Sequence, residues 1–287
     1  MPIGRLGVCS WSLEPETPRS LVESLKRVGV DCVQLALTPL VERPEVWGEV
    51  PKRLADAGIT LLSGMLATVG EDYSSLATIA STGGVRPDAT WPATLSRATR
   101  VAECAKRLGL PLVTFHAGFI PHRAGGHAPS RSEREVLIRR LRTIADVFDP
   151  HAIEVALETG QEEADTLADA LGELRRETVG INFDPANMIL YGMGEPVAAL
   201  RHLAPRVRQV HVKDAVRTET PGTWGREVVA GTGEVDWDRF FDLLHAMPHT
   251  VDVVIEREAG TTRELDIVAA AELVRNQLAR LAEVPAR

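Results

Sequence analysis

Cysteines, aromatic residues and long apolar runs are all scarce in this sequence. Its 287 residues include three cysteines, Cys9, Cys32 and Cys104, which are far apart and form no Cys-x-x-Cys pair. Isolated cysteines suit a reducing compartment and argue against a disulfide framework. No apolar run approaches the ~20 residues that a membrane-spanning helix needs, and the first residues lack the apolar segment of a secretion signal. We therefore expect a cytoplasmic protein with no membrane partner.

An excess of basic residues is also missing. The formal net charge is -8 at pH 7, and the sequence pI is about 5.6. Nucleic acids and anionic membranes attract basic faces, so we expect neither as a partner. The composition is 44% hydrophobic and 25% charged, as in ordinary globular proteins. Because composition does not shift along the chain, we expect a single domain over residues 1–287.

Strand signals and helix signals alternate along the whole chain. The apolar runs are rich in Val, Ile and Leu, which is typical of parallel strands buried on both faces. Eight such units predict an α/β fold, a single (β/α)8 TIM barrel. A doubly wound open sheet is the alternative, but no Gly-x-Gly-x-x-Gly follows an early strand. The predicted strands span residues 5–10, 30–37, 59–65, 110–116, 153–158, 179–184, 207–212 and 251–255.

The segments between the strands carry further predictions. Helical spacing and a closing Gly58 predict one helix over about residues 44–57. Residues 68–88 are rich in Ser, Thr and Gly and predict a long loop. Loops of this length in compact domains are usually functional, so we expect this one to shape a pocket mouth. Trp11 and Trp224 are candidates for an apolar pocket wall.

Four successive predicted strands end on side chains that can bind metals. Glu158, Asp184, His211 and Glu256 end the fifth to eighth strands. The C-terminal ends of barrel strands converge on one face, so these side chains are expected to surround one point. Three carboxylates so close repel one another unless a cation lies between them. Oxygen ligands with one imidazole suit a single Mn²⁺, Mg²⁺ or Co²⁺ ion, with Zn²⁺ as an alternative. Glu258 competes with Glu256 for the last ligand position.

Short motifs at these strand ends and elsewhere occur together over most of the chain. As a set they resemble the sugar phosphate isomerase/epimerase superfamily, the xylose isomerase-like TIM barrels. This group includes ketose 3-epimerases, hydroxypyruvate isomerases, inosose-processing enzymes and endonuclease IV. The motifs are His116-Ala-Gly118, Leu157-Glu158-Thr159, Asn182-Phe-Asp184-Pro-Ala-Asn187, His211-Val-Lys213-Asp214, Gly231-Thr-Gly233-Glu-Val-Asp236 and Ile255-Glu256.

The resemblance implies a metal-dependent isomerase or epimerase acting on a ketose, a keto-polyol or a related sugar. The reaction it implies is proton transfer next to a carbonyl through a metal-stabilised enediolate, with Glu158 and Glu256 as both ligands and acid–base groups. One alternative is a dehydratase or lyase acting on a keto-inositol or 3-keto-sugar. An endonuclease IV-like phosphodiesterase is disfavoured by the acidic charge. Because relatives are often dimers or tetramers, a homo-oligomer is compatible with the resemblance.

The resemblance also implies contacts to the substrate. Arg217 lies six residues beyond the metal-binding His and matches an Arg that reaches substrate oxygen in ketose 3-epimerases. His116 matches a His on the substrate or metal side, and Lys213 shares a strand face with the metal-binding His. Asn187 stands where ketose 3-epimerases and endonuclease IV carry His, and Gln34 stands where relatives often have an acid. These departures concern the substrate contacts more than the metal.

Overall fold

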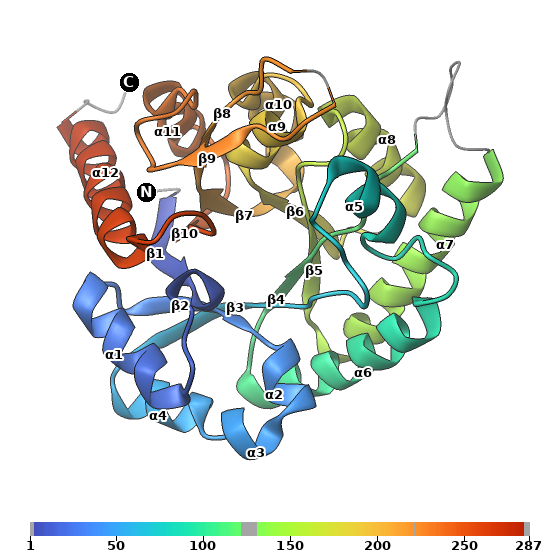
Figure 1. Cartoon of the computed structure of the whole chain (residues 1–287), viewed down its shortest axis with the longest axis horizontal. Coiled ribbons are helices and arrows are strands. Elements are labelled where there is room, and N and C mark those ends of the chain that lie inside the picture. Colours follow the sequence, from blue (N-terminus) through green and yellow to red (C-terminus); the bar gives the residue numbers. More distant parts are fainter. Residues whose placement is uncertain (1–2, 122–130, 221, 284–287) are drawn as a thin grey trace.

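The computed structural model describes residues 3–121, 131–220 and 222–283. Its main sheet consists of the parallel strands β1 (Ile3–Cys9), β2 (Cys32–Ala36), β3 (Thr60–Met65), β4 (Leu112–Phe115), β5 (Glu154–Glu158), β6 (Val179–Phe183), β7 (Val207–Val212) and β10 (Val251–Ile255). They pair in the order β1-β10-β7-β6-β5-β4-β3-β2 and close into a barrel (Figure 1). The predicted (β/α)8 barrel is confirmed.

Helices surround the barrel (Figure 1). None of the described helices has both the length and the apolarity needed to cross a membrane. The α-helices are α1 (Pro18–Val28), α2 (Thr38–Glu42), α3 (Pro44–Trp47), α4 (Val50–Asp56), α5 (Leu76–Thr82), α6 (Trp91–Leu108), α7 (Arg131–Phe148), α8 (Ala164–Leu174), α9 (Pro185–Tyr191), α10 (Pro196–Leu203), α11 (Trp237–His245) and α12 (Arg263–Glu283). Short 3-10 turns are η1 (Ser10–Leu13), η2 (Asp149–His151) and η3 (Ala204–Arg206).

Helix α1 shows how local sequence sets these elements. The Thr17 hydroxyl accepts a hydrogen bond from the backbone N–H of Ser20 at 3.1 Å, and Pro18 occupies the first helical position. Gly29 ends the helix in the left-handed region at φ 67°. Between these caps, residues such as Leu25 are buried and pack into the core.

The prediction of a single helix over residues 44–57 is wrong. The segment forms two short helices, α3 and α4, separated at Gly48 and Glu49. Pro51 has no N–H to donate to the carbonyl of Trp47, so a continuous helix would lose a hydrogen bond there. Pro51 therefore favours a break before α4.

Further elements were not predicted, among them two helices and a pair of strands. The Ser75 side chain caps α5, which lies within the segment expected to be a loop at residues 68–88. Asp184 and Pro185 start α9 directly after β6, in the same way that Thr17 and Pro18 start α1. After β7 the chain forms an antiparallel pair, β8 (Asp214–Val216) with β9 (Arg226–Val228).

The strand register positions the functional side chains. Glu158 on β5 pairs with Asn182 on β6, and Asn182 pairs with Gln209 on β7. His211 follows two residues later on β7 and pairs with Val254 on β10. Side chains two residues apart lie on the same face of a strand. The register therefore places the four predicted ligands at the C-terminal end of the barrel.

Candidate metal centre

The structure brings the four predicted ligands together. Glu158, Asp184, His211 and Glu256 are all buried, and each offers a ligand atom within 4.8 Å of the others. His211 Nδ1 lies 3.6 Å from Glu158 Oε1, 3.6 Å from Asp184 Oδ2 and 3.4 Å from Glu256 Oε2. One imidazole nitrogen thus faces three carboxylates that come from three other strand ends.

Two atoms of this cluster lack hydrogen-bond partners among the described residues. They are His211 Nδ1 and Asp184 Oδ2, both buried. Leaving a buried polar atom unpaired costs ~1–3 kcal/mol, and more for a charged group. A divalent cation between these atoms would satisfy both and would also neutralise the nearby carboxylates. The donor set, three carboxylates and one imidazole, therefore fits such an ion.

Burial and neighbouring charges set the protonation of the carboxylates. Burial raises the pKa of Asp184 to about 6, although Lys213 and His211 act in the opposite direction. Burial also raises the pKa of Glu256, but Lys213 and His211 outweigh it, and the net pKa lies well below the ordinary value. The pKa of Glu158 is likewise lowered on balance, because His116 and His211 outweigh burial. Both glutamates are therefore carboxylates at neutral pH.

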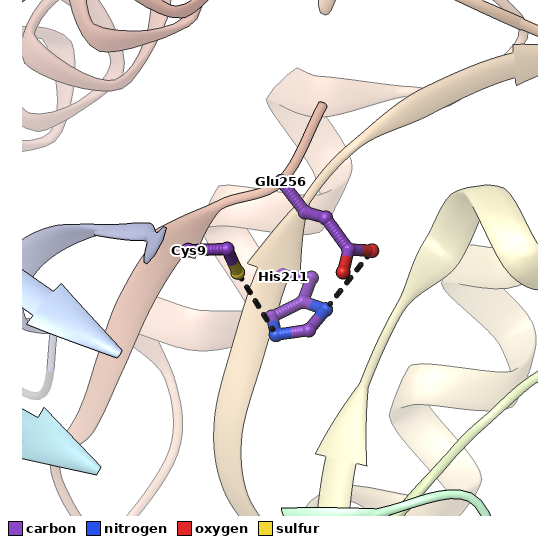
Figure 2. Close-up of side chains that lie close together, drawn as sticks. All are labelled: Cys9, His211 and Glu256. Atoms are coloured by element: carbon purple, nitrogen blue, oxygen red, sulfur yellow. Dashed lines mark hydrogen bonds and ion pairs between the residues drawn. The ribbon is translucent and has the colours of Figure 1, made fainter. Parts of the chain in front are cut away.

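Cys9 lies beside His211, on the Nε2 side of the ring, whereas the three carboxylates face Nδ1. Figure 2 shows the Cys9 sulfur facing Nε2 and the Glu256 carboxylate facing Nδ1; the Sγ–Nε2 distance is 3.7 Å. Burial raises the pKa of the Cys9 thiol far above its usual value. The thiol stays protonated and donates to Gln34 Oε1 at 3.4 Å. Cys9, His211 and Glu256 also offer ligand atoms within 4.8 Å of one another, but the sulfur faces Nε2, whereas the three carboxylates face Nδ1.

A cavity of about 650 Å³ opens next to the cluster, with Glu256 in its wall. The ring of Tyr191 meets that of Trp224 edge-on, with centroids 4.7 Å apart. Trp11 also lines the cavity, so the predicted wall positions of both tryptophans are confirmed. The lining is Trp11, Ala36, Thr38, Pro39, Met65, Ala67, Glu71, Tyr73, His116, Asn187, Leu190, Tyr191, Lys213, Trp224, Glu227, Glu256 and Glu258.

Three of the four predicted substrate residues lie in this cavity wall. Asn187 Nδ2 donates to Glu158 Oε1 at 3.0 Å, and Asn187 Oδ1 accepts from Lys213 Nζ at 3.2 Å. Lys213 Nζ also donates to Glu256 Oε2 at 2.8 Å and to Glu258 Oε2 at 2.7 Å. His116 Nε2 lies 3.7 Å from Glu158 Oε1. These residues hold the two glutamates as well as facing the cavity.

Arg217 is the fourth predicted substrate residue, and the structure does not bring it to the others. Its guanidinium pairs with Glu234, and its side chain is 60% exposed. It is absent from the cavity lining. A substrate contact by Arg217 remains a prediction that would require this ion pair to open.

Further contacts that the sequence analysis did not predict complete the site. The Trp11 indole N–H donates to Glu256 Oε1 at 2.8 Å. Glu71 and Tyr73, within the predicted long loop, line the cavity, and their only signal was the length of that loop. Glu258 pairs with Lys213 but lies outside the four-residue cluster, so the structure favours Glu256 as the cluster member.

Fold and site together define a TIM barrel with a buried centre of acidic residues and one histidine at the C-terminal ends of its strands. A family model described as xylose isomerase-like TIM barrel matches residues 22–278, and the chain belongs to this family. The xylose isomerase domain protein from Planctomyces limnophilus is 30% identical, with a TM-score of 0.83. That match covers 99% of this chain and 98% of the other.

More distant matches extend the comparison. A xylose isomerase-like TIM barrel protein from Mycobacterium smegmatis, solved with magnesium, is 15% identical and has a TM-score of 0.72 over 96% and 97% of the two chains. The 3-keto-D-glucoside 4-epimerase YcjR from E. coli is 17% identical, with a TM-score of 0.72 over 95% and 99%. At these identities the likeness shows the fold alone. The uncharacterized protein YihM of Escherichia coli is 25% identical over 107 residues, which cover 37% of this chain and 32% of YihM.

Proposed function

We propose that this protein is an isomerase or epimerase that depends on one divalent metal ion and acts on an uncharged ketose, keto-polyol or related sugar. The observation that carries the proposal is the pair of unpartnered buried atoms, His211 Nδ1 and Asp184 Oδ2, in a cluster with two glutamates. The family relationship supports it, as do matches that include a sugar epimerase and a protein solved with magnesium. Mn²⁺, Mg²⁺ and Co²⁺ suit this donor set, with Zn²⁺ as an alternative.

Glu158, Asp184, His211 and Glu256 would hold the ion. When bound, a divalent cation supplies a Lewis acid that polarises a carbonyl oxygen. Glu158 is ionised and takes the proton from the carbon next to that carbonyl. Asn182 Nδ2 and Asn187 Nδ2 hold its two carboxylate oxygens at 3.1 and 3.0 Å, so the base has a fixed orientation.

Glu256, a carboxylate at rest, accepts a proton from water and passes it to the substrate. Trp11 and Lys213 hold its two oxygens at 2.8 Å each, on a strand end separate from that of Glu158. Return of the proton to the opposite face of the same carbon gives an epimer, and return to the adjacent carbon gives an isomer. The proton gained by Glu158 leaves to water, so each turnover restores both carboxylates.

The charges of the cavity wall support an uncharged substrate. Among the lining residues, Glu71 and Glu258 add negative charge to that of the metal ligands, whereas Glu227 pairs with Arg257 at 2.7 Å. The Lys213 ammonium is already shared between Glu256 and Glu258. A phosphate or carboxylate would therefore meet repulsion in the described part of the wall. The aromatic lining instead suits the C–H face of a sugar.

Solvent exchange tests the proposal directly. The protein is loaded with Mn²⁺ and incubated in D₂O with a panel of free ketoses, keto-inositols and 3-keto-sugars. We expect deuterium at a carbon next to the carbonyl of at least one substrate, without loss of water from the product. Loss of water would point to a dehydratase or lyase. DNA cleavage with three zinc ions per chain, and no exchange on any sugar, would overturn the proposal in favour of a phosphodiesterase.

The proposal also covers the cellular location and the assembly of the protein. We include a reducing cytoplasmic location, which suits three free and buried cysteines. We also include a homo-oligomer, a dimer or tetramer, which light scattering would detect.

A further inference from the structure

The interior of the barrel behind His211 contains uncharged polar side chains from several strands. Gln34, Ser63, Thr114, Asn182 and Gln209 are all essentially inaccessible to solvent. Burying five such groups is costly unless each is hydrogen-bonded. Their contacts form two short chains of hydrogen bonds, and both chains reach Nε2 of the imidazole ring. This arrangement constrains which ring nitrogen of His211 carries a proton.

Gln34 is the end of the first chain. Its Oε1 lies 2.8 Å from His211 Nε2, and its Nε2 donates to Thr114 Oγ1 at 2.8 Å. The Thr114 hydroxyl in turn donates to Met65 Sδ at 2.9 Å. Because the Gln34 amide nitrogen is committed to Thr114, the atom that faces His211 is an acceptor. It can pair only with a proton on His211 Nε2.

Asn182 ends the second chain and cannot accept a hydrogen bond from His211 Nε2. Its Nδ2 donates to Glu158 Oε2 at 3.1 Å, and its Oδ1 accepts from Gln209 Nε2 at 3.2 Å. Gln209 Oε1 accepts from the hydroxyl of Ser63 at 2.6 Å. The Asn182 amino group, a donor, lies 3.0 Å from His211 Nε2 and competes with Gln34 in setting the protonation of that nitrogen; the contact to Gln34 is the shorter one, at 2.8 Å. Of these two amides, only Gln34 offers an oxygen to the ring nitrogen.

We infer that Gln34 is the positioning residue of the metal centre: it holds His211 as the tautomer with hydrogen on Nε2, so that the Nδ1 lone pair faces the three carboxylates. A histidine ligand must be unprotonated on the nitrogen that binds, and the partner of its other nitrogen decides which one that is. The unpartnered state of Nδ1 in the structure is what this tautomer predicts.

The neutrality of Gln34 is part of the inference. The centre already gathers three carboxylates, with Lys213 as the close cation. A carboxylate at position 34 would accept the same hydrogen bond but would add a fourth buried negative charge. The amide orients the imidazole without that charge. Gln34 therefore orients a ligand from the uncharged side of the barrel and is not itself a ligand.

Two variants at position 34 and one matched control test this role through metal binding rather than activity. Gln34→Leu removes the acceptor, Gln34→Glu keeps one, and Gln209→Leu removes an equally buried amide that does not contact His211. Mn²⁺ affinity is measured by titration calorimetry, and the Co²⁺ spectrum reports the ligand geometry. Thermal unfolding without metal reports the cost to the fold.

We expect Gln34→Leu to weaken Mn²⁺ binding ~10- to 100-fold, as loss of a hydrogen-bond partner of a histidine ligand typically does. Its Co²⁺ spectrum should change, while Gln34→Glu should keep most of the affinity and the wild-type spectrum. Gln209→Leu should lower the unfolding temperature about as much as Gln34→Leu but change the affinity far less. Equal affinity in Gln34→Leu and wild type would overturn the inference, as would equal loss in Gln34→Leu and Gln209→Leu.

The inference rests on the proposed metal site, and the same titrations separate the two. If the wild-type protein binds no divalent ion, the proposed function fails. If the wild type binds one ion and Gln34→Leu binds it equally well, only the role of Gln34 fails.

Discussion

The two sides of the barrel's C-terminal end differ in charge. The C-terminal ends of strands β5, β6, β7 and β10 lie at or next to Glu158, Asp184, His211 and Glu256. Strands β1 to β4 carry neutral groups at comparable depth, among them Gln34, the hydroxyl side chains of β3 and β4, and Cys9. The first side collects charge that only a cation can balance. The second side supplies hydrogen bonds and apolar contacts that orient what the first side holds.

This difference separates two kinds of effect. Changes on the charged side should alter metal binding, turnover and the stability of the metal-free protein together. Changes on the neutral side should act through orientation or through contact with the substrate, and they should leave the charge of the centre as it is. The following predictions test that division, from the largest expected effect to the smallest.

The largest effect is expected for Glu158→Gln. Loss of a general base typically lowers the rate ~10²- to 10⁴-fold, and here a metal ligand is weakened as well. We expect turnover on any substrate found by deuterium exchange to fall by at least ~10³-fold, with the circular dichroism spectrum unchanged. Glu154→Gln makes the same change at the other end of β5, where the carboxylate pairs with Arg208, and should keep wild-type turnover. Full activity in Glu158→Gln would show that the charged side is not the reaction site.

Lys213→Met should come next, because it removes the cation nearest to the carboxylates. Removing one partner of a buried ion pair costs ~3–5 kcal/mol. We expect the free energy of unfolding of the metal-free protein to fall by about this amount, and saturating Mn²⁺ to restore part of it, since the ion supplies the missing positive charge. Lys52→Met, at an exposed surface pair, serves as the control. A loss that Mn²⁺ does not reduce would argue against a shared electrostatic centre.

Tyr73→Ala probes the neutral side of the cavity. The Tyr73 ring stands edge-on to His116, with centroids 6.2 Å apart, and lines the cavity. Losing about 1 kcal/mol of apolar contact should raise KM roughly fivefold, with kcat within about twofold and Mn²⁺ affinity unchanged. Tyr73→Phe should retain the wild-type KM. A fall in metal affinity in Tyr73→Ala would break the division between the two sides.

The smallest effect concerns Glu162, a buried acid just beyond β5. Burial raises its pKa to about 8, although His116 acts in the opposite direction. The folded protein therefore binds a proton that the unfolded chain releases near pH 4.5, and the free energy of unfolding falls as the pH rises from there to about 8. Glu162→Gln should raise Tm by ~2–4 °C at pH 8 and by less at pH 5. Glu163→Gln, at an exposed position, is the control. An equal change at both pH values would contradict the assigned pKa.

The sequence predicted the charged side better than the neutral side. Glu158, Asp184, His211 and Glu256 stand where apolar runs stop, and barrel geometry makes strand ends converge, so a local signal was enough. The partners of Lys213 depend on packing between strands and could not be read from spacing. Segment 68–88 was recognised by its length, but the helix within it was missed.

Gln34 illustrates the same limit. From the sequence it is one polar residue in a buried strand, and only the packing of β2 against β7 across the barrel interior gives it a partner. Arg217 shows the converse, since its role came from resemblance alone and the structure pairs it with Glu234. The fold followed from periodicity along the whole chain, whereas side-chain partners required the three-dimensional arrangement.

The central claim is that the four residues on the charged side hold one divalent ion. Titration calorimetry of metal-free wild type and Asp184→Asn with Mn²⁺, together with elemental analysis of the loaded proteins, tests it most directly. We predict one ion per chain in the wild type and a loss of binding in Asp184→Asn, because that change removes the charge of the carboxylate whose Oδ2 has no hydrogen-bond partner among the described residues. Absence of binding in the wild type, or the same stoichiometry and affinity in both proteins, would contradict the claim.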